Sequence, residues 1–301
     1  MTPEAPARPA RSRWRRRQNV VAFLLLAIPL TGVLVFRLLP GVASFGLAFT
    51  EWPLFGTPEF IGLANFQELM RDDVFWQALR NTVYYVVVSV PGIVFISLGL
   101  ALILNRGIRG IKIFRTIYFL PVVSSMVAVG IMWRWLYNAQ YGLINTGLGF
   151  LGIEPINWLG SSTWAMPALI IVTVWREMGF YMIIFLAALQ GVPRPLMEAA
   201  RLDGAGPWQR FWGVTFPAIS PVTFFVSILA MINTFQAFEY MFVMTDGGPR
   251  NATLTLVYYL FQEGFQRFSM GYASAIAFVL FAIILLITIV QWRIGERRVV
   301  Y

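Results

Sequence analysis

Uncharged apolar runs alternate with short polar connections along almost the whole chain. Five such runs cover residues 19–36, 83–104, 116–133, 218–238 and 269–292. A sixth run, residues 164–190, is interrupted only by Arg176 and Glu177. Each run is close to the roughly 20 residues that a helix needs to cross the hydrocarbon core of a bilayer. The pattern predicts an all-α integral membrane protein with six transmembrane helices.

The same pattern divides the chain into a membrane domain and short polar segments. The domain is expected at residues 19–293, with spans at about 19–45, 78–105, 113–137, 164–190, 217–243 and 269–293. Residues 1–18 hold several prolines and an arginine cluster, which predicts a disordered basic tail lying on anionic lipid. Residues 191–216 form the longest cytoplasmic connection, and residues 294–301 form a second cytoplasmic tail.

Basic residues gather at alternate connections. The first tail, the loops at 106–115 and 194–210, and the last tail are rich in arginine, whereas the opposite connections mix few bases with acids. This bias predicts that both termini are cytoplasmic and that the protein is a multi-pass protein of the cell membrane. Because the arginines adjoin apolar runs, the net charge of +9 is better explained by membrane orientation than by nucleic acid.

The composition weakens most enzyme interpretations. The chain has no Cys and no His, so thiolate and imidazole metal sites and nucleophiles are excluded, and no metal site is predicted. Its one lysine, Lys112, follows Ile111, whereas a phosphate-binding loop needs Gly before Lys. Asp72 and Asp73 lack the second acidic cluster of a metal-diphosphate enzyme and are interpreted as a solvated helix start. The chain is therefore not expected to be an enzyme or to bind a cofactor.

The connection at residues 198–217, EAARLDGAGPWQRFWGVTFP, is unusually polar and rich in glycine. Pro193 and Pro195 favour the start of one short helix, and the glycines at 204 and 206 favour its end. Pro207 favours a second helix, in which Trp208, Phe211 and Trp212 share a face suited to the membrane interface. Periodicity alone leaves two interpretations open, a rigid helical elbow and a plain amphipathic re-entry loop.

This stretch resembles the cytoplasmic coupling motif of ATP-binding-cassette importer permeases. The family spacing is E-A-A, three residues, G, nine residues, then an apolar, any and apolar residue before P. The chain has Val214 and Phe216 where the family more often has Ile and Leu, which keeps the apolar character. The residues to which the resemblance assigns coupling to the ATPase are Glu198, Ala199, Ala200, Asp203, Gly204 and Pro217.

Further stretches are similar to the carbohydrate-uptake branch of that superfamily, of the maltose and glycerol-phosphate type. They are GLANFQEL at 62–69, NTVYY at 81–85, the stretch 120–145, LAALQGVPRPLMEAA at 186–200, TDGGP at 245–249 and GYASA at 271–275. The resemblance covers nearly the whole chain after residue 20. It implies the type I permease fold and import of a sugar or sugar-like solute, such as an oligosaccharide, a polyol or a glycerol-phosphate compound.

The same resemblance implies several partners. They are a second homologous permease, two copies of an ATPase subunit that would carry ATP and Mg, an extracytoplasmic solute-binding protein, and membrane lipid. In this family the outer loop that follows the fifth span faces the binding protein. That assigns a role to Asp246, Gly247, Gly248 and Pro249, although the same residues also fit a simple tight turn.

Polar residues inside spans are costly and therefore mark functional positions. Asn233, Gln236 and Tyr240 are spaced so that one helix face carries them, with Phe235 and Glu239 on an adjoining face. Amides and aromatic rings suit a neutral polyol, so these five are candidate solute-pathway residues. Hydrogen bonding between helices is the alternative for each of them. The pair Arg176 and Glu177 is open to three interpretations: mutual neutralisation, pairing with the partner permease, or solute binding.

Two other functions compete with an importer permease. A membrane enzyme acting on lipid-linked sugars or prenyl chains would need acidic metal clusters or a membrane-facing base, which the sequence lacks. A stand-alone secondary transporter would need proton-relay acids in several spans, and only Glu177 and Glu239 are available. Co-purification with a separate ATPase subunit would separate all three.

Overall fold

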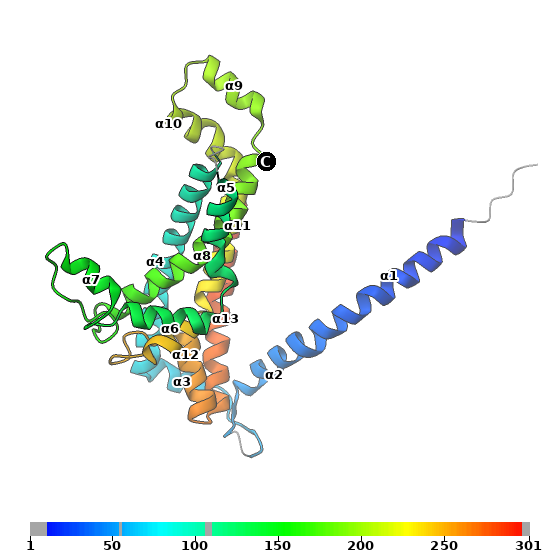
Figure 1. The fold of residues 1–301 in the computed structure, drawn as a ribbon. Helices are drawn as coiled ribbons and strands as arrows, with labels where there is room; N and C mark the ends of the chain where they lie inside the picture. Colours follow the sequence, from blue (N-terminus) through cyan, green and yellow to red (C-terminus); the bar gives the residue numbers. More distant parts are fainter. Residues whose placement is uncertain (1–10, 54–55, 106–109, 297–301) are drawn as a thin grey trace, which may run out of the picture.

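The structure is a computed structural model that describes residues 11–53, 56–105 and 110–296. Helix α1 (Arg11–Val33) continues through a π-helical turn (Leu34–Leu38) into α2 (Leu39–Leu47). This long helix stands apart from the other helices and joins them only near its C-terminal end (Figure 1), where α2 packs on α13 (Met270–Glu296). The most apolar window between Val20 and Leu47 has no buried residue. Its apolar surface is therefore left for lipid or another protein to cover.

The basic tail expected at residues 1–18 is helical in its second part. Helix α1 begins at Arg11, because residues 11–28 contain neither Gly nor Pro and arginine is a favourable helix former. Residues 1–10 lie outside the described part of the chain. At the other terminus, α13 runs to Glu296, three residues beyond the expected end of the last span, and residues 297–301 also lie outside the description.

Helices α4 (Asp73–Leu104) and α8 (Ala165–Gln190) form the centre of the fold. They approach closely because Gly92 faces Val174, where an added Cβ would lie 3.1 Å from the valine side chain. Polar side chains also join them: the hydroxyls of Tyr85 and Thr173 lie 2.5 Å apart, and Ser97 donates to the carbonyl of Met178 at 3.0 Å. More than half of the most apolar window of α8 is buried, so α8 is the core helix of this domain.

The third predicted span, residues 113–137, is not one helix. It is divided into α5 (Ile111–Val123) and α6 (Met126–Leu136), which meet at an angle of 101°. Helix α5 packs tightly on α8, because a Cβ at Gly179 would collide with the carbonyl oxygen of Tyr118. Within the described residues, five helices are long and apolar enough to cross a membrane, or six if α5 and α6 form one broken span.

The connection predicted as an elbow forms one end of the molecule (Figure 1). It consists of α9 (Arg194–Leu202) and α10 (Pro207–Arg210), followed by a π-helical turn (Phe211–Thr215) and α11 (Phe216–Phe235). The fifth span was expected to continue to residue 243, but α11 ends at Phe235. The chain then makes a short non-helical passage before a third π-helical turn (Met241–Thr245).

The opposite end is built from short elements between the long helices. They are β1 (Thr50–Glu51), its antiparallel partner β2 (Glu59–Phe60), α3 (Ala64–Arg71), α7 (Leu143–Gly149), α12 (Leu256–Phe261) and a π-helical turn (Gln262–Gln266). Asn65 on α3 holds β1 in place, because its side-chain amide donates hydrogen bonds to the carbonyls of Ala48 and Thr50, each at 2.9 Å. Asp72 caps α4 through the amide of Val74 at 2.8 Å.

Asp72 also ties three separate segments together at this end. Its second carboxylate oxygen accepts hydrogen bonds from the hydroxyl of Tyr259 on α12 at 2.5 Å and from that of Tyr272 on α13 at 2.7 Å. Burial on its own would raise the pKa of Asp72, but these two hydrogen bonds and two backbone amides lower it below the ordinary value of 3.8. The charged form of Asp72 therefore stabilises the junction of α4, α12 and α13.

Candidate functional site

A cavity of about 390 Å³ lies among the central helices. Helices α4 and α8 supply part of its wall, the break between α5 and α6 supplies a second part, and the end of α11 with the passage after it supplies the rest. Its polar lining residues are Tyr85, Thr173, Arg176, Glu177, Tyr181, Asn233, Thr234, Gln236, Glu239 and Tyr240. Polar side chains from three of the predicted spans, the second, fourth and fifth, thus converge on one space.

Both interruptions of the predicted spans open onto this cavity. Val122 and Met126 border it beside the α5/α6 break, and Gln236 and Ala237 border it where α11 ends. Non-helical backbone at membrane depth is tolerated where it is buried in protein or lines a polar cavity, because free carbonyl groups need partners. Here the Ala237 carbonyl accepts a hydrogen bond from the hydroxyl of Thr255 at 3.3 Å. Discontinuous helices around a polar site are a recurrent arrangement in transporters.

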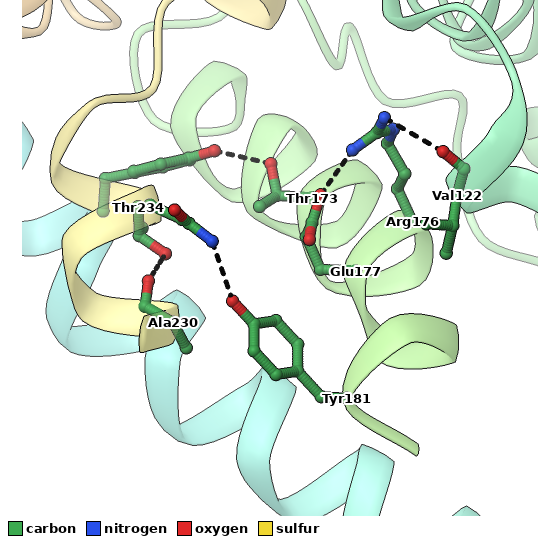
Figure 2. A network of polar contacts seen from close by, with 9 residues as sticks. Val122, Thr173, Arg176, Glu177, Tyr181, Ala230 and Thr234 are labelled. Carbon is green, nitrogen blue, oxygen red and sulfur yellow. Dashed lines mark hydrogen bonds and ion pairs between the residues drawn. The ribbon is translucent and has the colours of Figure 1, made fainter. Parts of the chain in front are cut away.

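Arg176 and Glu177 occupy the side of the cavity formed by α8 (Figure 2). Nη1 of Arg176 contacts Oε1 of Glu177 at 2.5 Å, and Nη2 donates to the carbonyl of Val122 at 3.3 Å. The two side chains are 11% and 21% exposed, so the charges are largely withdrawn from solvent. Of the three interpretations of this pair, the structure shows that Arg176 and Glu177 neutralise one another. It also shows that Arg176 caps the C-terminal end of α5.

The structure brings four of the five predicted solute-pathway residues to the cavity, although the predicted reason was wrong. Asn233, Gln236, Glu239 and Tyr240 all line it, but they do not share a continuous helix face because α11 ends between them. Phe235 is 3% exposed and packs in the core, outside the lining. The chain is not helical at residues 236–238, and Gln236, Ala237, Glu239 and Tyr240 border the cavity in and just after this stretch. A role in solute binding stays a prediction for each of them.

Tyr181 is an important cavity residue that the sequence analysis did not select. Its hydroxyl accepts a hydrogen bond from the side-chain amide of Asn233 at 3.1 Å, which joins α8 to α11 (Figure 2). A signal was present, because Tyr181 follows Glu177 by four residues and so shares its helix face. Thr255 was not predicted either. Its hydrogen-bond partner is the backbone carbonyl of Ala237, and no residue type in the sequence indicates that this carbonyl lies outside a helix.

The elbow has the two-helix form that the sequence predicted. Pro193 precedes α9 as its N-cap, and α9 ends in a Schellman motif: Ala205 N–H bonds the carbonyl of Ala200 at 3.0 Å, and Gly204 N–H bonds that of Arg201 at 3.1 Å. Gly204 has a φ of +77°, which glycine adopts far more readily than other residues. An added Cβ would meet nothing within 4 Å. Gly204 is therefore required for backbone conformation and not for space within this chain.

The surface of the elbow carries exposed apolar side chains. Leu202 at the end of α9 is 90% exposed and Trp208 on α10 is 72% exposed, while Glu198 lies exposed on α9. Trp208, Phe211 and Trp212 contact one another with ring centroids 5.1–6.2 Å apart, as their predicted common face requires. The arrangement can dock against a protein or a membrane interface. Coupling to an ATPase stays a prediction for the six residues to which the resemblance assigns it, Glu198, Ala199, Ala200, Asp203, Gly204 and Pro217.

The segment Asp246–Pro249 forms the tight turn that its composition favours. Asp246 and Gly247 both have positive φ, and the Asp246 carboxylate accepts a hydrogen bond from the hydroxyl of Tyr258. Burial, together with this hydrogen bond, raises the pKa of Tyr258 to about 12. Asn81 on α4 holds the continuation of the turn by donating to the carbonyls of Asn251 and Leu254 at 2.7 and 2.9 Å. These contacts explain the turn, and a role toward a binding protein stays a prediction.

This combination of a mostly helical membrane fold, broken spans around a polar cavity and a protruding two-helix elbow defines a permease. Residues 77–299 match the family described as the binding-protein-dependent transport system inner membrane component. The chain belongs to this family, and it is an integral protein of the inner membrane.

Full-length relatives support the same assignment. The chain is 38% identical to the probable ABC transporter permease YesP of Bacillus subtilis, with 97% of this chain and 95% of the relative covered. It is 37% identical to the lactose transport system permease LacF of Rhizobium radiobacter, with 96% and 98% covered. It is also similar to a chain of a bacterial alginate ABC transporter solved in complex with an alginate-bound periplasmic protein, with a TM-score of 0.83, 23% identity and coverage of 96% and 98%. That likeness shows that the fold is that of an ABC importer permease.

Proposed function

We propose that this chain is one of two permease subunits of an ATP-driven importer that passes a saccharide from a solute-binding protein into the cytoplasm. The observation that carries the proposal is the meeting of two broken spans at one polar cavity, lined by amide, hydroxyl and aromatic groups. Such a lining suits a solute rich in hydroxyl groups. The name of the LacF relative, a lactose permease, points to the same solute class.

We place ATP hydrolysis on separate ATPase subunits, which would hold ATP and Mg. Lys112 is the only lysine and lacks the preceding glycine of a phosphate-binding loop, so this chain has no such loop of its own. The elbow of α9 and α10 is the surface that we assign to the ATPase, since it protrudes from one end of the fold and exposes Leu202 and Glu198 (Figure 1). At the opposite end the Asp246–Pro249 turn is assigned to the binding protein.

The test is transport by the reconstituted complex. The chain, its partner permease and their ATPase are placed in vesicles with the cognate binding protein, and uptake of labelled saccharides is followed with and without ATP. We expect uptake that requires both ATP and the binding protein. Uptake driven by a proton or sodium gradient without ATP would instead support a secondary transporter. Chemical conversion of a lipid-linked sugar would support an enzyme.

A further inference from the structure

We propose that the central cavity accepts an uncharged saccharide and rejects anionic ones, with the hydroxyl of Tyr240 as an unfilled hydrogen-bonding position for the solute. The proposal rests on the proposed function and narrows its solute class. It separates neutral oligosaccharides and polyols from sugar phosphates and uronates, all of which a carbohydrate permease of this fold is in principle able to carry.

The charges of the cavity lining favour a neutral solute. Two carboxylates, Glu177 and Glu239, stand against one guanidinium, Arg176, so the described lining has one net negative charge. Both terminal nitrogens of Arg176 are engaged within the protein, one by Glu177 and the other by the Val122 carbonyl. The remaining Nε is buried and has no hydrogen-bond partner within the described structure, but Glu177 already balances the charge of the guanidinium. An anionic solute would lose its hydration beside a wall of net negative charge, and no uncompensated cation of the described lining would offset that loss.

Tyr240 provides a second observation, independent of the charges, that points to a bound solute. The residue lines the cavity and is 6% exposed, and its hydroxyl is buried without a hydrogen-bond partner within the described structure. Most buried polar groups in proteins are paired, and one left unpaired is destabilising. A hydroxyl of the solute both donates and accepts, so it would satisfy the Tyr240 oxygen whichever way the phenol proton points.

The neighbouring groups complete a surface for a polyol. Asn233 donates its amide N–H to Tyr181, which leaves the amide oxygen free to accept a hydrogen bond from a sugar hydroxyl. Gln236 is exposed at the end of α11 and offers both a donor and an acceptor. Phe180, which is partly exposed, provides a ring face for the C–H side of a sugar. Each of these groups is uncharged, as recognition of a neutral solute requires.

Binding to the purified complex tests the proposal without selection by the binding protein. The chain, its partner permease and the ATPase subunits are incubated with two size-matched pools of di- to tetrasaccharides, one neutral and one made of uronates, and the retained species are identified by native mass spectrometry. We expect neutral species to be retained at least about tenfold over uronates. Tyr240→Phe should lower retention of the neutral species by about fivefold, and the matched control Tyr84→Phe, outside the cavity, should not change it.

Charge reversal gives the second arm. Glu239→Lys should raise retention of uronates relative to neutral species by about tenfold, because it supplies the missing free cation. Equal retention of both pools by the wild-type complex, or no effect of Tyr240→Phe, would overturn the inference and leave the proposed importer function intact. Retention of neither pool by a complex whose ATPase responds to a loaded binding protein would overturn the saccharide assignment itself.

Discussion

Arg176 donates a hydrogen bond from Nη2 to the carbonyl oxygen of Val122 at 3.3 Å, so a charged side chain of α8 caps the broken helix α5. The break leaves carbonyl groups at membrane depth without helical partners, and each such group is costly in a bilayer. Glu177 in turn neutralises the guanidinium that does the capping. The pair is thus part of what allows the third span to turn by 101° beside the cavity.

Removal of Arg176 should therefore destabilise the complex. Arg176→Gln leaves Glu177 largely buried without its partner, and we expect a loss of about 3 kcal/mol or more. The double variant Arg176→Gln/Glu177→Gln removes the unpaired charge and should recover part of this loss. The measurement is thermal unfolding of the detergent-solubilised complex. Arg134→Gln is the matched control, since Arg134 donates to the Val243 carbonyl at the same 3.3 Å on the exposed surface. Equal destabilisation by both single variants would contradict the capping role.

The second break depends on a hydroxyl. Thr255 is 1% exposed and donates to the Ala237 carbonyl, so Thr255→Val keeps the shape but leaves that carbonyl unpaired. We expect a loss of stability of about 1–3 kcal/mol and slower uptake. Thr223→Val serves as the control, because the Ile219 carbonyl that Thr223 contacts lies within α11 and keeps its helical bond. If Thr255→Val behaves like the control in both assays, the hydroxyl does not support the break.

The cavity is bordered by two breaks in the helices, one between α5 and α6 and one after α11. The sequence indicates the first break better than the second. Pro121 and the Ser124–Ser125 pair interrupt the third apolar run, so a bend there was available to inspection, although one span was predicted. The stretch after Phe235 contains neither Gly nor Pro, and its break depends on Thr255, a residue about twenty positions away that only the folded chain brings near. Hydrophobic runs predict spans because bilayer crossing is a local requirement. A break that is held by a hydrogen bond to a distant residue depends on the folded chain, so the local sequence does not predict it.

The elbow and the cavity residues show the same difference between features set by the nearby sequence and features set by distant contacts. Prolines and glycines predicted α9 and α10 to within a few residues, since caps and stops act through the nearby backbone. The spacing of Asn233, Gln236 and Tyr240 selected cavity residues by assuming a continuous helix, and it included Phe235, which the structure places in the core. Tyr181 and Thr255 were not predicted, because their hydrogen-bond partners lie on other segments of the chain.

Gln236 offers a test of solute contact that is separate from folding. Gln236→Leu removes an exposed amide from the cavity wall and keeps similar bulk, so we expect uptake to fall by about tenfold while basal ATP hydrolysis by the complex is unchanged. Gln140→Leu, on the exposed connection between α6 and α7, should leave both unchanged. Parallel loss of uptake and basal hydrolysis in Gln236→Leu would show a packing role instead.

The junction around Asp72 predicts how the protein responds to acid. Since the folded-state pKa of Asp72 lies below 3.8, its carboxylate contributes stability at all pH values above about 3.8, and this contribution is lost as the pH falls through the folded-state pKa. Asp72→Asn should therefore lower the unfolding temperature between pH 7 and pH 4.5, with a difference that shrinks under stronger acid. Tyr259→Phe removes one stabilising hydrogen bond and should shift the acid limit to higher pH, whereas the exposed Tyr141→Phe should not. A difference between Asp72→Asn and wild type that grows as the pH falls toward 3 would contradict this linkage.

Gly204 gives the sharpest test of coupling through the elbow. Gly204 ends α9 at a φ of +77° with open space around it, so within this chain a substitution acts through backbone conformation. Gly204→Val disfavours this conformation strongly, whereas Gly204→Asn tolerates it, and Gly213→Val alters a nearby glycine that has no positive φ. Glu198→Lys reverses the exposed charge on the same helix.

The decisive measurement is co-purification of the ATPase subunit together with solute-stimulated ATP hydrolysis in vesicles. We expect Gly204→Val and Glu198→Lys to insert normally, because insertion depends on the apolar runs, and yet to release or uncouple the ATPase. Gly204→Asn and Gly213→Val should remain close to wild type. Full ATPase binding and full stimulated hydrolysis in both Gly204→Val and Glu198→Lys would show that the elbow is only a re-entry loop and that it does not couple the ATPase to transport.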